Sequence, residues 1–196
     1  MSKIYSHSRL WLFESCPEFY RLKYIDKNLP EIPTKINLFL GSAVHSSLEW
    51  LYRRIKSNEH IELDELIKNF ALNWREELLQ HPRLAQGEKP EEYFNKGIKF
   101  LINYFMNNKP FIDDTIEIEK KIIFSLGEDY KIQGFIDRLV KNSSGEYEVH
   151  DYKTNASMKS QIEVDSDRQL AFYHLGLNEL FGEDIKVKLI WHFLAH

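Results

Sequence analysis

The chain has 196 residues, of which 43% are hydrophobic and 14% aromatic. This length and composition are typical of one domain with a real core, and they exclude a disordered or fibrous chain. The formal net charge of −4 argues only weakly against nucleic-acid binding, because binding depends on local surface charge and not on the sum.

No apolar run approaches the roughly 18 to 20 residues that a membrane helix needs, and the N-terminal residues lack a signal-peptide pattern. The single cysteine, Cys16, excludes an internal disulfide and fits a reducing compartment. We therefore expect a soluble, cytoplasmic protein.

Residues 6–25 are expected to form two short helices that meet at Pro17, or one helix kinked there, because the proline ring removes a backbone donor and clashes with the preceding turn. Ser6 or Ser8 is the expected N-cap. A Pro-containing linker over residues 26–35 follows.

An apolar stripe then predicts a long helix over residues 37–55. Gly41 and His45 lie one turn apart, beside this stripe. Glycine inside a helix costs about 1 kcal/mol relative to alanine, so Gly41 needs a reason such as the close approach of another backbone. His45 alone is more typical of a hydrogen-bonded packing residue than of a ligand.

Two further helices are predicted over residues 61–81 and 90–107, and we expect them to cover a sheet and shape a channel for the substrate. Residues 114–126 are strand-like. Their Glu117 and Glu119 are left out of any metal site, because charges that block pairing are common on edge strands.

The stretch from residue 131 to 154 predicts two strands joined by a polar, Gly-containing turn. Asp137 lies inside the first strand. Asp151 and Lys153 close the second strand and leave it on the same face. Buried charges are costly unless they pair with one another or hold a metal. A plain salt bridge between Lys153 and one aspartate therefore stays as an equal alternative.

A polar loop over residues 155–160 precedes a helix predicted from about 165 to 181, with Asp165 or Ser166 as its cap. Gln169 and Tyr173 are neighbours on this helix. Residues 185–194 predict a last strand, and its terminal position favours a longer natural protein.

Asp137 followed by Asp151-x-Lys153 on the next strand resembles the core signature of the PD-(D/E)XK nuclease superfamily. Other motifs resemble its RecB-type branch of helicase-linked exonuclease domains and CRISPR-adaptation nucleases. In order, these motifs are the Cys16-Pro17 helix, Gly41-x-x-x-His45 and Gln169-x-x-x-Tyr173.

The resemblance implies an α/β, restriction-endonuclease-like fold with a mixed central sheet flanked by helices. Residues 1–196 would form a single RecB-like domain, with a mainly helical cap over 1–110 and a catalytic sheet core over 111–196.

The resemblance also implies a metal site for Mg²⁺ or Mn²⁺, since carboxylates suit such hard cations. The implied ligands are His45, Asp137, Asp151 and the Tyr152 carbonyl. Lys153 would orient or deprotonate the attacking water. Gln169 and Tyr173 would position the substrate strand. CRISPR-adaptation members bind an iron–sulfur cluster through four cysteines, so with Cys16 alone no cluster is expected.

The implied function is a metal-dependent DNA nuclease in DNA repair, recombination or mobile-element processing, and the His45 motif favours an exonuclease. Its substrate would be DNA, single-stranded or with a free end, and a helicase or another repair protein would be a partner. One alternative is a catalytically silent nucleic-acid-binding or scaffolding subunit with the same fold. Another is an unrelated α/β protein in which Lys153 pairs with Asp151, which predicts no metal affinity.

Overall fold

Five strands form one mixed sheet in the computed structural model, which describes residues 3–29, 35–81, 89–111, 114–155 and 157–196. The strands are β1 (Lys3–Ser6), β2 (Thr115–Leu126), β3 (Tyr130–Lys141), β4 (Tyr147–Lys153) and β5 (Val187–Phe193). β2 and β4 run antiparallel to β3, whereas the β1–β3 and β4–β5 pairs are parallel. The mixed sheet and its flanking helices agree with the predicted architecture.

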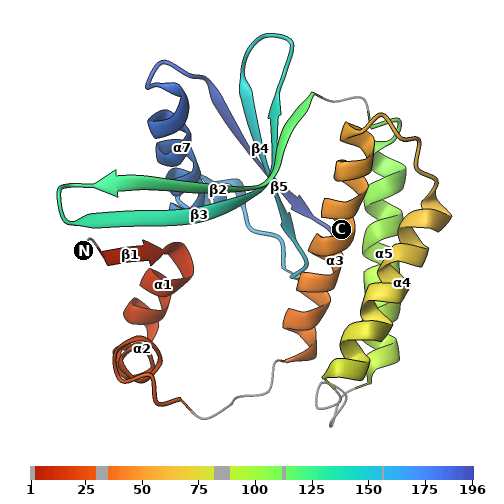
Figure 1. The fold of residues 1–196 in the computed structure, drawn as a ribbon, viewed down its shortest axis with the longest axis horizontal. Coiled ribbons are helices and arrows are strands. Elements are labelled where there is room, and N and C mark those ends of the chain that lie inside the picture. Colours follow the sequence, from red (N-terminus) through yellow and green to blue (C-terminus); the bar gives the residue numbers. More distant parts are fainter. Residues whose placement is uncertain (1–2, 30–34, 82–88, 112–113, 156) are drawn as a thin grey trace.

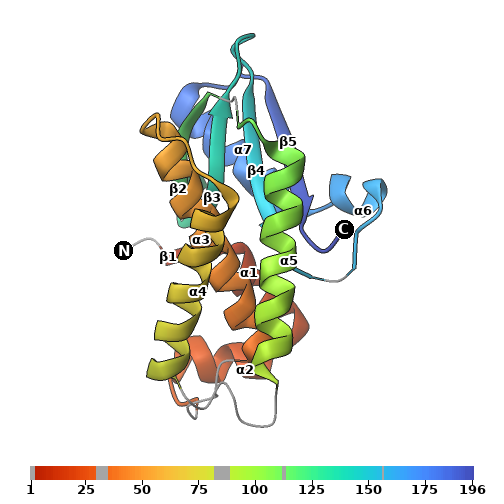
Figure 2. The same cartoon turned by 90° about the vertical axis from the view of Figure 1, so that its right-hand side faces the viewer.

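Helices cover both faces of this sheet (Figures 1 and 2). They are α1 (His7–Ser15), α2 (Pro17–Tyr20), the π-helix η1 (Arg21–Ile25), α3 (Ile36–Lys56), α4 (Leu63–Gln80), α5 (Pro90–Asn108), α6 (Gln161–Asp165) and α7 (Arg168–Phe181). Helices α3, α4 and α5 pack side by side, and α7 lies on the other side of the sheet (Figure 2).

The predicted break at Pro17 is confirmed, and Ser6 is the N-cap of α1, since its hydroxyl accepts from the Arg9 amide at 3.2 Å. Strand β1 and helix α6 were not predicted. The predicted cap of the last long helix is wrong, because Asp167 caps α7 by accepting from the Gln169 amide at 2.8 Å. Ser166 instead ends α6.

Two strands share one edge of β3 and leave a gap between them. β2 pairs along the other edge of β3. On the shared edge β1 pairs with residues Tyr130–Gln133 and β4 with residues Arg138–Lys141. Residues 134–137 therefore lie on this edge between the end of β1 and the point where β4 begins to pair with β3.

Two buried clusters hold these layers together. One fills the space between α3, α4 and α5 and reaches the sheet at Tyr152. The other packs α7 against β2, β3 and β4 around Ile122 and Ile136. A Cβ on Gly41 would lie 3.2 Å from the Thr154 hydroxyl, so the close neighbour of this glycine is the loop after β4. No helix of the described chain is long and apolar enough to span a membrane.

Candidate active site

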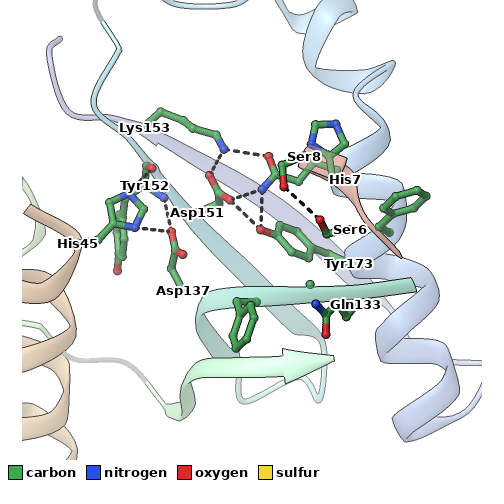
Figure 3. Close-up of a pocket in the computed structure, with 14 residues that line it drawn as sticks. Ser6, His7, Ser8, His45, Gln133, Asp137, Asp151, Tyr152, Lys153 and Tyr173 are labelled. Carbon is green, nitrogen blue, oxygen red and sulfur yellow. Dashed lines mark hydrogen bonds and ion pairs between the residues drawn. The ribbon is translucent and has the colours of Figure 1, made fainter. Parts of the chain in front are cut away.

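The gap on the edge of β3 opens into a cavity of about 500 Å³ (Figure 3). Segments from both ends of the chain line it. The lining residues are Ser6, His7, Ser8, His45, Gln133, Gly134, Phe135, Asp137, Asp151, Tyr152, Lys153, Gln169, Phe172 and Tyr173. All seven residues predicted for the site, from His45 to Tyr173, thus line one cavity.

The Tyr152 peptide group joins three of these residues. Its amide donates to Asp137 Oδ2 at 2.8 Å, and its carbonyl accepts from His45 Nε2 at 2.8 Å. His45 Nδ1 lies 3.5 Å from the same Asp137 oxygen. Burial disfavours the imidazolium, but the hydrogen bond and charge of Asp137 outweigh it, so the pKa of His45 is raised. Helix α3 and strands β3 and β4 therefore converge on one peptide group.

Glu119 of β2 lies beside His45 and Asp137. One ligand atom from each of Glu119, Asp137 and His45 lies within 4.8 Å of the others. Burial and then the charge of Asp137 raise the pKa of Glu119. Its φ of 52° is in the left-handed region that non-glycine residues rarely adopt, as is common at functional sites.

The expectation that left Glu119 out of the metal site, as an edge-strand charge, did not anticipate this proximity. In the described sheet β2 is an edge strand paired to β3, but its Glu119 carboxylate lies beside Asp137 and His45. A signal was present in the sequence: Glu119 lies eight residues before Gly127, and Asp137 lies eight residues after Asp129. A tight turn at residues 127–129 therefore sets the two carboxylates opposite each other.

Asp151 is buried at 3% exposure and is held from three sides (Figure 3). Its Oδ2 lies 2.6 Å from Lys153 Nζ. Its Oδ1 accepts from Tyr173 Oη at 2.9 Å and from Gln169 Nε2 at 3.2 Å. Burial raises the pKa of Asp151 despite the opposing charge of Lys153. Burial and the Asp151 charge also raise the pKa of Tyr173, so the phenol keeps its donor proton.

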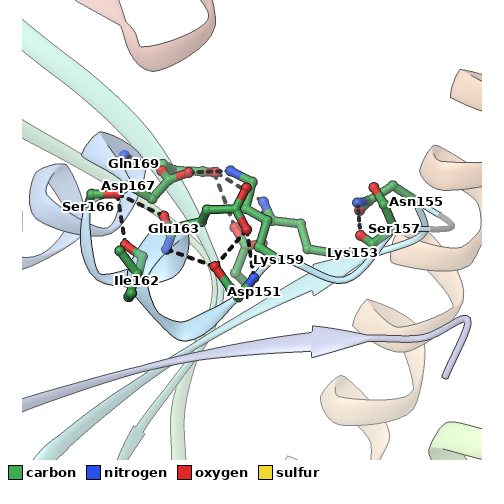
Figure 4. A network of polar contacts seen from close by, with 11 residues as sticks. Asp151, Lys153, Asn155, Ser157, Lys159, Ile162, Glu163, Ser166, Asp167 and Gln169 are labelled. Carbon is green, nitrogen blue, oxygen red and sulfur yellow. Dashed lines mark hydrogen bonds and ion pairs between the residues drawn. The ribbon is translucent and has the colours of Figure 1, made fainter.

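Lys153 is oriented by the same group of residues. Its ammonium donates to Gln169 Oε1 at 3.0 Å and lies 4.8 Å from the ring centre of Trp191. Lys159 also lies 4.8 Å from that ring centre and binds Asp167, the cap of α7, at 2.7 Å (Figure 4). Gln169 and Tyr173 thus hold the Asp151–Lys153 pair, and their contact with a substrate strand stays a prediction.

A buried polar network anchors the Tyr152 side chain on the α3–α5 side of the sheet. Arg138 Nε donates to Tyr152 Oη at 3.0 Å, and Tyr104 Oη lies 3.3 Å from it. Tyr104 Oη in turn lies 2.7 Å from Tyr52 Oη. All four side chains are at most 4% exposed. Nothing in the local sequence pattern indicated this network, because its members come from two helices and two strands.

The donor set fits a divalent cation. It offers two facing carboxylates, an imidazole and a carbonyl, which suit Mg²⁺ and, with the imidazole, Mn²⁺. Two half-buried carboxylates that repel each other are also what a cation would stabilise. Asp151 lies outside the group formed by His45, Glu119 and Asp137, so its role as a ligand stays a prediction. Cys16 is a free, exposed thiol.

Comparison with known proteins agrees with this geometry. The family model described as the PD-(D/E)XK nuclease superfamily matches residues 4–194, nearly the whole chain. No curated protein matches the chain significantly. The match includes both strands of the signature and the helices that supply His45, Gln169 and Tyr173. The sheet therefore has the restriction-endonuclease-like fold, and the chain belongs to the PD-(D/E)XK nuclease superfamily.

Proposed function

We propose that this nuclease is a metal-dependent DNA exonuclease of the RecB-type branch, with residues 1–196 as one catalytic domain. The observation that carries the proposal is the junction at the Tyr152 peptide, which brings His45 and Asp137 together beside the Asp151–Lys153 pair. The preference for exonuclease action rests on the placement of the Gly41-x-x-x-His45 helix against this junction.

His45, Asp137, Glu119 and the Tyr152 carbonyl would hold a divalent cation, with Asp151 as a further ligand. When bound, the cation acts as a Lewis acid toward the phosphate and lowers the pKa of water. Lys153 lies at the cavity with its ammonium fixed by Asp151 and Gln169. It would orient the attacking water and stabilise the negative charge that develops on the phosphate.

The Lys153–Asp151 ion pair alone would also occur in a protein without catalysis. That alternative does not account for Glu119. Its carboxylate lies close to Asp137 and His45, and its backbone is in the left-handed region. A catalytically silent DNA-binding subunit likewise has no use for this cluster. We infer that the carboxylates are retained to bind a cation.

The decisive experiment is the degradation of end-labelled single-stranded and double-stranded DNA with Mg²⁺, Mn²⁺ or EDTA. The wild type should degrade DNA from its ends only with metal, and Asp151→Ala and Lys153→Ala should abolish this. Lys188→Ala, an exposed lysine on β5, serves as the control that keeps activity. DNA binding without cleavage under either metal would instead support the silent subunit.

A free strand end for this enzyme would come from a helicase or another repair protein. The same assay tests this part of the proposal with a DNA duplex that carries a single-stranded tail. Faster degradation of the tailed duplex than of the blunt one would support a partner that unwinds DNA. Equal rates would contradict it.

A further inference from the structure

One face of the β2–β3 hairpin continues outward from the metal site. In the antiparallel register Lys121 faces Phe135, Ile123 faces Gln133 and Ser125 faces Lys131. Side chains alternate along a strand, so these pairs share the face that begins at Glu119 and Asp137. We call these six residues the hairpin track: Lys121, Ile123, Ser125, Lys131, Gln133 and Phe135.

The two faces of the hairpin differ in what covers them. On the other face Ile122 packs against α7, Phe124 contacts Phe172 of α7, and Ile132 is buried as well. On the track face Phe135 is 50% exposed and Ile123 is 38% exposed, and Lys121 and Lys131 are exposed as well. Figure 3 draws Gln133 on the side of β3 away from Tyr173 of α7, which agrees with this division.

The cations on the track differ from the other lysines of the site. Lys120, Lys153 and Lys159 each bind a carboxylate within the protein. Among the described residues, Lys121 and Lys131 form no ion pair and Phe135 has no ring partner. A half-exposed aromatic ring directly opposite an unpaired lysine offers a stacking surface beside a positive charge. Surfaces that bind single-stranded nucleic acid combine these two features.

The track is continuous with the cavity. Gln133 and Phe135 also line the cavity, and Phe135 lies two residues before Asp137, about 7 Å along the strand. Lys131 at the far end lies six residues from Asp137, about 20 Å away. Figure 1 shows the hairpin projecting away from α3–α5, and the exposure of Lys121, Ile123 and Phe135 shows that solvent reaches this face.

We propose that the hairpin track binds single-stranded DNA on its way to the carboxylates. Phe135 stacks on a base near the cleavage site, and Lys121 and Lys131 contact phosphates. A single strand is required because the bases of a duplex are already stacked on one another and do not present a free face. That the track leads the DNA strand to a cleavage site rests on the proposed nuclease function.

Binding without cleavage tests the track directly. Fluorescein-labelled oligothymidylate would be titrated with protein in EDTA, over a series of NaCl concentrations, and followed by anisotropy. Phe135→Leu should weaken binding about tenfold, because a stacked base is lost, and Phe135→Trp should bind like the wild type. Lys121→Gln and Lys131→Gln should each reduce the slope of log K against log salt by about 0.7.

Matched controls lie on the same strand but off the track. Tyr130→Leu removes a side chain that is 51% exposed on the alternate face, and Lys141→Gln removes an exposed lysine of β3. Both should bind oligothymidylate like the wild type. If the controls lose as much affinity as the track variants, the proposal is overturned, because binding would then not depend on the track.

The outcomes separate this inference from the proposed function. A wild type that cleaves DNA with Mn²⁺, together with track variants that bind and cleave equally well, would overturn the track and leave the nuclease intact. If the wild type cleaves nothing, the nuclease proposal fails, and the anisotropy in EDTA still decides whether the track binds. A wild type that binds no oligothymidylate overturns the track.

Discussion

Glu119 and Asp137 place their carboxylate oxygens within 4.8 Å of each other and of a His45 nitrogen. The two side chains come from strands joined by a tight turn, so this closeness is built into the hairpin. Negative charges this close repel each other, and the raised pKa of Glu119 reflects burial and that repulsion. This repulsion destabilises the metal-free protein, and a bound cation would relieve it.

Mn²⁺ should raise the melting temperature of the wild type, because a ligand that binds only the folded state stabilises it by about 2.7 kcal/mol at 100 times its dissociation constant. Without metal, Asp137→Asn should melt close to the wild type, since it removes both the repulsion with Glu119 and the favourable contact with His45. It should also lose the Mn²⁺-dependent rise. Differential scanning fluorimetry with Mn²⁺ or EDTA measures both effects, and an Asp137→Asn protein that keeps the full rise would contradict the assignment.

Loss of a residue that hydrogen-bonds to a metal ligand typically weakens metal binding roughly 10- to 100-fold. Glu119→Gln removes a ligand itself, so it should weaken Mn²⁺ binding by more than this. Isothermal titration calorimetry with Mn²⁺ gives the affinity without any cleavage. The matched control is Glu117→Gln, two residues away on β2, whose carboxylate binds Lys120 at 2.8 Å. Equal affinities for the two variants would remove Glu119 from the metal site.

Tyr152→Phe should weaken Mn²⁺ binding about tenfold while the protein stays folded. The lost hydroxyl is the group through which Arg138 and Tyr104 hold this residue, and its own peptide group bonds to His45 and Asp137. Tyr52→Phe is the control, because it removes a buried hydroxyl that bonds to Tyr104, one step further from the Tyr152 peptide. If both variants bind Mn²⁺ alike, the network stabilises the fold without positioning the site.

The His150–His192 pair should make the protein sensitive to acid. The two rings lie 2.8 Å apart from Nδ1 to Nε2, and burial followed by the charge of Arg138 lowers the pKa of His192 to about 4 and that of His150 to about 2. Above about pH 6.5 both rings are neutral in the folded and the unfolded chain. As the pH falls below this value, the unfolded chain takes up protons that the folded chain does not.

The free energy of unfolding should therefore fall as the pH drops from about 6.5 toward 4. His192→Gln should flatten this dependence, whereas His81→Gln, at an exposed histidine, should leave it unchanged. Urea unfolding at several pH values, followed by circular dichroism, measures the slope. A wild-type stability that is constant across this window would contradict the neutral state of the buried pair.

Gly97→Ala should lower stability even though alanine favours helix by about 1 kcal/mol. The added Cβ would overlap the ring of Phe70, which is fully buried between α4 and α5. Overpacking of this kind typically costs about 1–3 kcal/mol. Urea denaturation gives the difference, and Leu72→Ala at an exposed position of α4 is a control for substitutions in the same helix pair. A more stable Gly97→Ala protein would show that Phe70 can move aside.

Local patterns in the sequence predicted most of the helices and strands and the positions of Asp137, Asp151 and Lys153. These residues lie on two strands joined by a turn, and a window of about 25 residues contains both the apolar alternation and the turn. The closeness of Glu119 to Asp137 was not predicted, because it depends on the register across the hairpin. β1 was missed because four residues give little pattern and the partner strand begins at Tyr130, far along the chain.

The Tyr152 network was beyond prediction for a different reason. Tyr52, Tyr104 and Arg138 lie on separate elements, and each sits in an apolar pattern where a hydroxyl or guanidinium has no visible partner. Only the packing of α3 and α5 on the sheet brings these groups together. Sequence spacing predicts which residues share a face of one element, but not which elements meet.

His45 and Tyr152 are 107 residues apart in the chain, and Glu14 and Arg168, which form an ion pair at 2.6 Å, are 154 apart. Contacts of such high sequence separation slow folding, because long loops must close before the contacts form. During synthesis, helices α1 to α5 leave the ribosome before any residue of β4. The residues of the candidate site are therefore not brought together until α7 has followed, when the fold is nearly complete.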